Sequence, residues 1–457
     1  MLKVLPQSLI NELHGIAAFD EQSFLAAHQQ AAVTSVRLHP VKHSAAFQGN
    51  EQVPWCREGR YLTERPIFTL DPAYHAGAYY VQEASSMFLQ YVLQQVLTDT
   101  RNLRVLDLCA APGGKSTLIA SMLHSSSLLI SNEVIRTRAS ILEENMTRWG
   151  YMNTWVTSND PRTFSKLPGY FDVIVVDAPC SGSGLFRKDE RALEEWSEAN
   201  VQLCSQRQQR ILADVWPALK EDGILVYATC SYSPQEDEEI LDWLCAEFDI
   251  ESIQINVPES FDVVSVISPM QKANGYRFFP DKVKGEGFFI AALRKKEGTE
   301  TLRQAKFKSN SDKKIAQQSG HLLQADDLVY VHTGDDQVSA MNPTHEPDWQ
   351  LLQQHLFLRK AGLILGSAGA KEWIPAHEVA LSVNAAKELN YISVNKEQAL
   401  KFLKKEEMPL IVSERGWHVV SYEGLGLGWI KSLGNRINNY LPKHWRIRME
   451  ITDADWA

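Results

Sequence analysis

Short apolar runs alternate with amphipathic stretches through the middle of the chain. The apolar runs are LRVLDL, SLLISNE, FDVIVVD and GILVYAT, and stretches with helical spacing such as KSTLIASML and RASILEENMTRWG lie between them. Strands that alternate with helices predict a parallel, doubly wound α/β sheet. We expect its last strand in GFFIAALR, near residues 286–294.

The pattern changes on both sides of this unit. Residues 1–95 open with helical stretches and then become rich in loops and aromatic side chains. Residues 299–325 are polar and basic with few large apolar residues, which is typical of a linker or a mobile arm. Short strands and glycine turns return over 326–457. We therefore expect a small N-terminal α+β module, a Rossmann-like domain over 96–298, a basic linker and a C-terminal domain.

Composition narrows the class of protein. With 44% hydrophobic and 22% charged residues among 457, the chain is an ordinary soluble globular sequence, and its net charge of −10 argues weakly against bulk nucleic-acid binding. Six cysteines without a CxxC pair predict neither a disulfide framework nor a zinc site, so we expect no metal and a reducing, cytoplasmic location. The sequence contains neither a signal peptide pattern nor an apolar run of membrane-helix length.

A loop of small residues joins the first strand of the sheet to its helix. The loop is DLCAAPGGKS, whose small side chains let a ligand approach the backbone while the helix N-terminus offers free N–H groups. The loop matches neither GxGxxG nor a Walker motif, so a phosphate site is the weaker interpretation. The expected cofactor-binding residues here are Cys109, Ala110, Ala111, Pro112, Gly113, Gly114 and Lys115, and Asp177 at the end of a later strand is expected at the same ligand.

Acidic residues follow the next two strands. Glu133 ends the second strand, where an acid holds ribose hydroxyls, and Asp160 follows the third strand, where it could hold an adenine edge. A nucleoside without a pyrophosphate fits this series, and S-adenosylmethionine is the common ligand of that kind. Either acid taken alone could simply cap its loop.

Two thiols end the fourth and fifth strands. Cys180 follows Asp177 in FDVIVVDAPCSGSG, and Cys230 ends GILVYATC. Because neighbouring parallel strands carry their loops to the same edge of a sheet, we expect both thiols above one crevice, facing the reactive end of the cofactor. Buried cysteines are commonly inert, but these two lie at strand ends beside glycine, serine and acidic residues.

Three motifs together resemble a known family. DLCAAPGGK, DAPCSGSG and ATCSYSPQEDE, in this order, are similar to the motifs of the Nol/Nop/Sun family of RNA cytosine-C5 methyltransferases. GAYYVQEASSM resembles the segment that precedes the catalytic domain in that family. The stretch from PAHEVALS to LPKHWRI resembles the PUA-like tail of its bacterial ribosomal RNA small-subunit methyltransferase F group.

The resemblance implies an S-adenosylmethionine-dependent RNA cytosine-C5 methyltransferase that acts on small-subunit ribosomal RNA. It implies that Cys230 attacks C6 of cytosine, that Cys180 assists release of the product and that Asp177 contacts the N3/N4 edge of the base. The residues alone do not rank the thiols, because DNA cytosine methyltransferases use a Pro-Cys nucleophile.

Basic residues mark two expected RNA contacts. Arg187 and Lys188 follow Cys180 closely and could hold a phosphate near the flipped nucleotide, or lie in a solvated loop. The tail contributes a second basic set, interleaved with Trp429, Tyr440 and Trp445, which could stack bases or belong to the core. The basic residues expected to bind RNA in this tail are Lys431, Arg436, Lys443, Arg446 and Arg448.

The stretch after Cys230 is rich in acidic residues. The carboxylates of QEDEE after Cys230 are expected to begin a helix, with Ser233 as its N-cap, and to take no part in the reaction. We expect a monomer that binds RNA and no membrane. The same chemistry on transfer RNA and a non-catalytic RNA-binding assembly factor on this fold are the alternatives, and a DNA enzyme fits the motifs less well.

Overall fold

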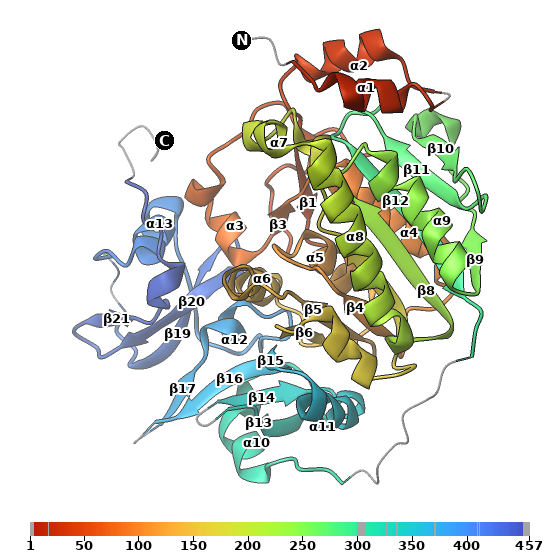
Figure 1. Cartoon of the computed structure of the whole chain (residues 1–457). Coiled ribbons are helices and arrows are strands. Elements are labelled where there is room, and N and C mark those ends of the chain that lie inside the picture. The colour runs from red at the N-terminus through yellow and green to blue at the C-terminus, as the bar shows by residue number, and fades with distance from the viewer. Residues whose placement is uncertain are drawn as a thin grey trace.

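A ten-stranded mixed sheet forms the centre of the protein (Figure 1). The computed structural model describes residues 4–16, 18–298, 308–325, 327–334, 337–369, 372–408, 410 and 412–450. The strand order is β10-β11-β12-β8-β7-β4-β5-β6-β15, with β9 paired to β12. The strands are β4 (Arg104–Asp107), β5 (Leu128–Asn132), β6 (Thr154–Thr157), β7 (Phe171–Asp177), β8 (Leu219–Thr229), β9 (Ile250–Ile253), β10 (Val264–Ile267), β11 (Asn274–Phe278), β12 (Phe288–Lys295) and β15 (Leu358–Lys360).

The five strands from β4 to β8 are parallel, which confirms the predicted α/β fold. The order reverses between β4 and β7, which is the switch point where doubly wound sheets bind ligands. The pairing of β12 with β8 is antiparallel. The predicted last strand is therefore present, and the small strands β9, β10 and β11 extend the sheet beyond it.

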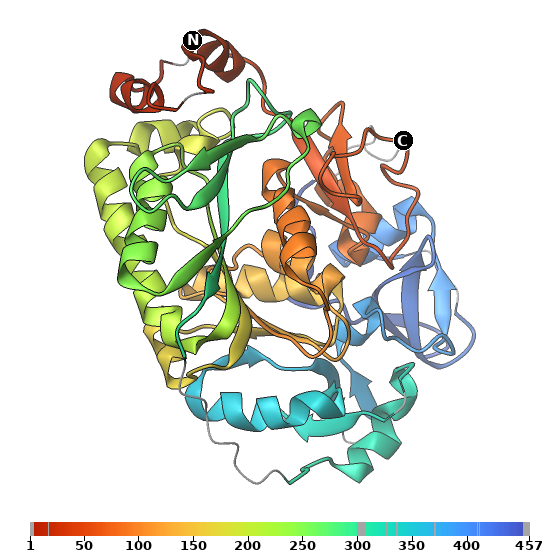
Figure 2. The same cartoon turned by 90° about the vertical axis from the view of Figure 1, so that its right-hand side faces the viewer.

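Helices cover both faces of the sheet, because its buried strands are apolar on both sides (Figure 2). One face packs α4 (Phe88–Val96), α5 (Gly114–Met122) and α6 (Arg136–Trp149). The other packs α8 (Glu198–Val215) and α9 (Glu238–Glu247). The alternation is visible in β4, where Val105 belongs to the first core and Leu106 to the second.

The N-terminal module has two parts. Helices α1 (Gln7–Leu13) and α2 (Glu21–His28) pack against Tyr232 and Phe279, beside α7 (Glu190–Glu195) in Figure 1. The second part is a three-stranded sheet of order β2-β1-β3, with α3 in the connection between β2 and β3. The bounds are β1 (Thr34–Leu38), β2 (Gly59–Leu62), α3 (Pro72–Ala76) and β3 (Tyr79–Val81).

Buried Arg37 of β1 fastens this sheet to the central domain. Its guanidinium donates to the side-chain oxygen of Gln82 at 2.8 Å and to the Thr117 hydroxyl of α5 at 2.6 Å. The module therefore contacts the helix that follows the glycine loop. Helix α4 packs on the central sheet, so the expected boundary at residue 95 falls inside an element of the catalytic domain.

The C-terminal region contains two four-stranded sheets, β13-β14-β16-β17 and β18-β19-β20-β21. Their strands are β13 (Val329–His332), β14 (Val338–Met341), β16 (Leu363–Ala368), β17 (Trp373–Pro375), β18 (Tyr391–Ser393), β19 (Gly416–Tyr422), β20 (Leu425–Ser432) and β21 (Ile437–Asn439). The helices are α10 (Lys313–Ser319), α11 (Glu346–His355), α12 (His377–Leu381) and α13 (Lys396–Lys404).

The expected basic linker is wrong for most of its length. Residues 299–307 lie outside the described residues, but 308–325 include α10, whose Ile315 is buried in one core with Leu322 and Tyr330. A few apolar side chains at the right positions are enough to fold this polar segment onto the first C-terminal sheet.

One C-terminal strand belongs to the catalytic sheet. β15 pairs antiparallel with β6, with Leu358 opposite Thr157. Beyond the strand end, Asn159 and Phe357 exchange two hydrogen bonds, from the Phe357 amide at 2.9 Å and from the Asn159 amide group at 3.2 Å. The C-terminal region is thus built into the central domain. No helix in the described ranges has the length and apolar composition that a membrane crossing requires.

Candidate active site

The glycine loop lies at the carboxyl end of β4, where the chain enters α5. Gly113 has a φ of 115°, a left-handed conformation that favours glycine, and α5 begins at the next residue without a side-chain cap. Helix α6 holds the loop through Arg138, which donates to the Ala111 carbonyl at 2.8 Å, and Asn145, which donates to the Pro112 carbonyl at 2.7 Å. The loop is therefore fixed while the first amides of α5 remain open to a ligand.

A cavity of about 190 Å³ adjoins this loop. Its other wall comes from the N-terminal module, through Tyr80, Gln82, Glu83 and Ser86. The wall on the catalytic side consists of residues expected at the cofactor, namely Cys109, Ala110, Ala111, Pro112, Gly114, Lys115 and Asp177.

The two acids expected at the nucleoside lie at the same edge of the sheet but do not line this cavity. Glu133 follows β5, is 3% exposed, accepts from the Ile135 amide at 2.9 Å and pairs with Arg138 at 3.3 Å. Asp160 is exposed and accepts from the Arg162 amide at 3.0 Å. Both acids stabilise their own loops, as the alternative interpretation predicts, and they follow neighbouring parallel strands in the expected order.

An ion pair joins the glycine loop to β7. Lys115 Nζ lies 2.6 Å from a carboxylate oxygen of Asp177. Burial opposes the charged form of Lys115, but the attraction of Asp177 outweighs it and raises the pKa of the lysine. Asp107, fully buried beside this pair, accepts from the Ser116 hydroxyl at 2.6 Å, and burial raises its pKa to about 7.

The two predicted thiols are in contact. Because β7 and β8 are neighbouring parallel strands, the loops after them meet, and the sulfur atoms of Cys180 and Cys230 are 3.0 Å apart. The interaction with Cys230 and burial raise the pKa of Cys180 well above its ordinary value. The two sulfurs therefore lie together at the carboxyl edge of the sheet, while neither lines the cavity beside the glycine loop.

The carboxylates after Cys230 differ from the prediction. Ser233 precedes a short 3-10 turn over Pro234–Glu236 and its side chain makes no cap hydrogen bond. Glu236 and Asp237 are fully buried, and only at Glu238 does α9 begin. This burial is not predictable from the local sequence, because an acid-rich stretch after Ser-Pro has the pattern of a solvated helix start.

One of the expected RNA contacts near the thiols is wrong. The Arg187 side chain is 4% exposed, and its guanidinium binds both carboxylate oxygens of Glu286, at 2.9 and 3.1 Å. A buried, paired arginine cannot offer its charge to a phosphate on the surface. Lys188, the next residue, is exposed.

The tail keeps most of its basic surface. Arg436, Lys443, Arg446 and Arg448 are exposed. Lys431 instead pairs with Glu372. Of the aromatic residues, Trp429 is core at 2% exposure, Tyr440 is 39% exposed, and Trp445 lies under the guanidinium of Arg148 of α6, 5.1 Å from its ring centre.

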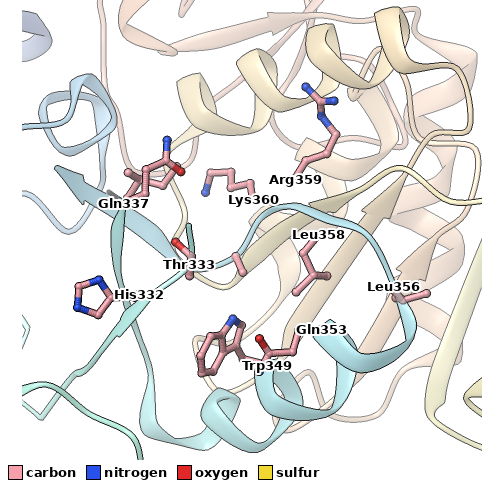
Figure 3. Close-up of a pocket in the computed structure, with 11 residues that line it drawn as sticks. His332, Thr333, Gln337, Trp349, Gln353, Leu356, Leu358, Arg359 and Lys360 are labelled. Carbon is pink, nitrogen blue, oxygen red and sulfur yellow. The ribbon is translucent and has the colours of Figure 1, made fainter. Parts of the chain in front are cut away.

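A second cavity, of about 160 Å³, lies where the first C-terminal sheet meets β15 (Figure 3). Arg359 and Lys360 line it, but Arg359 pairs with Glu143 at 2.9 Å and Lys360 with Glu378 at 2.6 Å. Arg359 and Lys360 are therefore both paired with carboxylates where the C-terminal region meets the catalytic domain. None of the predicted site residues lines this cavity. The described parts of the chain contain no group of three or more potential metal ligands.

Comparison with known proteins gives matches along most of the chain. Residues 5–84 match the N-terminal domain of 16S rRNA methyltransferase RsmF, 94–294 match 16S rRNA methyltransferase RsmB/F, and 389–447 match the methyltransferase RsmF PUA domain. Among solved structures, a methyltransferase homologue from Pyrococcus horikoshii is 26% identical with a TM-score of 0.51, covering 64% of this chain and 100% of that one. The fold is also shared with NSun6 from Pyrococcus horikoshii, solved with SFG, at 20% identity and a TM-score of 0.54, covering 65% of this chain and 100% of that one.

Full-length relatives extend the similarity across all domains. The ribosomal RNA small subunit methyltransferase F of Psychromonas ingrahamii is 32% identical and covers 96% of both chains. That of Vibrio atlanticus is 30% identical and covers 96% of this chain and 97% of its own length. The chain therefore belongs to the ribosomal RNA small subunit methyltransferase F family.

Proposed function

We propose that this protein transfers a methyl group from S-adenosylmethionine to C5 of a cytosine in small-subunit ribosomal RNA. The observation that carries the proposal is the contact of two thiols, 3.0 Å apart, at the sheet edge that also carries the Lys115–Asp177 pair. Acidic and basic groups alone would serve many transfer reactions, whereas a thiol beside a base-binding carboxylate fits covalent activation of a pyrimidine.

Cytosine C5 is a poor nucleophile until a thiolate adds to C6. In the proposed reaction Cys230 is that thiolate, and the new S–C6 bond makes C5 electron-rich. Asp177 contacts the N3/N4 edge, and a proton on N3 makes C6 more electrophilic. C5 then bonds to the methyl group, whose bond to the sulfonium sulfur of the methyl donor breaks and leaves that sulfur neutral. Loss of the C5 proton to a base and elimination of the Cys230 thiolate restore the aromatic ring, and Cys180, in contact with that sulfur, assists this release.

The methyl donor is S-adenosylmethionine, which supplies an electrophilic methyl group. The cavity beside the glycine loop fits a nucleoside cofactor, because it combines small side chains with the open N-terminus of α5. The acids after β5 and β6 lie outside the cavity lining, at the same edge of the sheet. We assign Cys109 to Lys115 to this ligand, with Glu133 and Asp160 at its nucleoside end.

Ribosomal RNA is the proposed substrate because the full-length relatives from Psychromonas ingrahamii and Vibrio atlanticus are small-subunit ribosomal RNA methyltransferases by name and because the tail has an exposed basic surface. The residues proposed to contact phosphates are Lys188, Arg436, Lys443, Arg446 and Arg448. We expect the enzyme to act as a cytoplasmic monomer. Bisulfite mapping of cellular RNA with and without the gene tests the substrate. Loss of a methylated cytosine from transfer RNA alone, or no loss from any RNA, would contradict the proposal.

Cysteine variants test the two thiol roles. Cys230→Ser should abolish methyl transfer, and full activity in this variant would refute the nucleophile. Cys180→Ser should accumulate a protein–RNA adduct that survives a denaturing gel, because Cys230 attacks but is released slowly. Loss of turnover without an adduct would exclude the release role of Cys180.

A further inference from the structure

A buried carboxylate links the loops that carry the two thiols. Glu236 accepts from the backbone amide of Ser181 at 2.8 Å and from its hydroxyl. It also accepts from the hydroxyl of Ser231 at 2.6 Å. Ser181 follows Cys180 and Ser231 follows Cys230, so one carboxylate joins the residues next to both sulfurs.

Helix α8 and strand β8 both form hydrogen bonds to Glu236. Gln208 of α8 donates to the carboxylate at 3.2 Å and also to the Pro179 carbonyl, directly before Cys180. The Tyr227 hydroxyl of β8 donates to the Glu236 backbone carbonyl at 2.6 Å. Glu236 is therefore held by β8, the strand that precedes Cys230, and by α8, which also binds the residue before Cys180.

Among the described residues, Glu236 forms no ion pair, in contrast to the two acids that follow it. Asp237 and Glu238 both pair with the buried Arg277. The hydrogen-bond partners of Glu236 within the described residues are all uncharged donors, which is the set that an ionised carboxylate accepts. Burial raises the pKa of Glu236, and these donors act against that shift by stabilising the ionised form. Its negative charge contributes to the raised pKa of Cys180, after the contact with Cys230 and burial.

We propose that Glu236 is a positioning residue for the proposed reaction: its carboxylate clamps the Cys180 and Cys230 loops together and so holds the two sulfurs in contact. The same negative charge disfavours a second thiolate at Cys180. Two thiolates in contact would repel each other, and Cys180 would then compete as a nucleophile. The inference rests on the proposed function only for the roles of the two cysteines. The clamp itself is a property of the protein without RNA.

Thiol alkylation measures the clamp without any RNA. In the full chain, the rate of iodoacetamide labelling of each cysteine is followed against pH by peptide mass spectrometry. Glu236→Gln removes the charge and retains one acceptor oxygen, so labelling of Cys180 should begin at a lower pH than in the wild type. Glu239→Gln, an exposed carboxylate in the same stretch, removes the same charge and should leave the Cys180 profile unchanged.

Turnover provides the second readout. Glu236→Ala should lower kcat about 100-fold, since a misplaced nucleophile is costly, while the KM values for RNA and cofactor stay within about threefold. Glu236→Gln should recover part of this loss. If Glu236→Ala does not fold, Ser231→Ala, which removes one hydrogen bond to the carboxylate, should give a smaller loss of kcat with unchanged KM.

The outcomes separate this inference from the proposed function. Wild-type labelling profiles and kcat in Glu236→Gln would overturn the clamp while leaving cytosine methylation intact. A shifted Cys180 profile in a protein that methylates no cytosine would retain the clamp and remove the proposed reaction. A fall in kcat/KM that comes from a higher KM, with kcat unchanged, would also overturn the positioning role.

Discussion

Asp107 should lower the stability of the protein as pH rises. Its pKa lies at about 7 in the folded chain, against an ordinary value of 3.8, because the carboxyl is fully buried at the end of β4. The folded state therefore binds this proton more tightly than the unfolded state. The contribution of Asp107 to stability falls as pH rises from about 4 to about 7.

The size of the effect follows from the two pKa values. The free-energy penalty that Asp107 places on folding increases by about 3 kcal/mol from pH 5 to pH 8, because the carboxyl ionises at about pH 4 in the unfolded chain but only at about pH 7 in the folded chain. Asp107→Asn has no charge to lose. The unfolding free energy of Asp107→Asn minus that of the wild type should thus increase by about 3 kcal/mol from pH 5 to pH 8.

Thermal unfolding measures this difference. If all 457 residues unfold in one step, about 3 kcal/mol corresponds to a change of about 3 °C in the Tm difference between variant and wild type. Ser116→Ala is the matched control, because it removes the hydrogen bond to Asp107 and keeps the carboxyl, so it should retain the pH dependence. Parallel Tm curves for Asp107→Asn and the wild type from pH 5 to pH 8 would refute the reasoning.

Three other predictions concern RNA, cofactor and core. Lys443→Ala with Arg446→Ala should reduce the magnitude of the salt slope of RNA binding by about 1.4 for a single strand, and an unchanged slope in filter binding would exclude both phosphate contacts. Asn159→Ala, which removes both hydrogen bonds to the residue before β15, should weaken cofactor binding about threefold by calorimetry, and equal affinity would show that this turn does not support the cofactor. Arg277→Met should lower stability by about 3–5 kcal/mol, because it leaves Asp237 and its neighbour buried without a cation; a urea midpoint equal to that of the wild type would contradict this.

The sequence was informative where function depends on strand ends. Parallel strands bring their carboxyl ends to one edge whatever the loops do, so the pairing of Cys180 with Cys230 and the position of Asp177 followed from order along the chain. The fold class followed from the same alternation of strands and helices.

Side-chain partners far apart in the sequence were not predictable in this way. Arg187 is paired with Glu286, and nothing in the pattern near Arg187 indicates that partner. Glu236 was missed because burial of an acid is set by the loop of Ser181, which packs against it from another strand. The three-residue strand β15 is too short to give a periodic signal, and its pairing is decided by tertiary contacts.

The position of β15 has a consequence for the growing polypeptide. β6 acquires its outer neighbour only when residues 358–360 have been made, about 200 residues later. At 5–20 residues per second, this strand stays an open edge for about 10–40 s during translation. A nascent chain interrupted after residue 298 therefore exposes a pairing edge that other unfinished chains can join, and the last third of the polypeptide shields the first two thirds from aggregation.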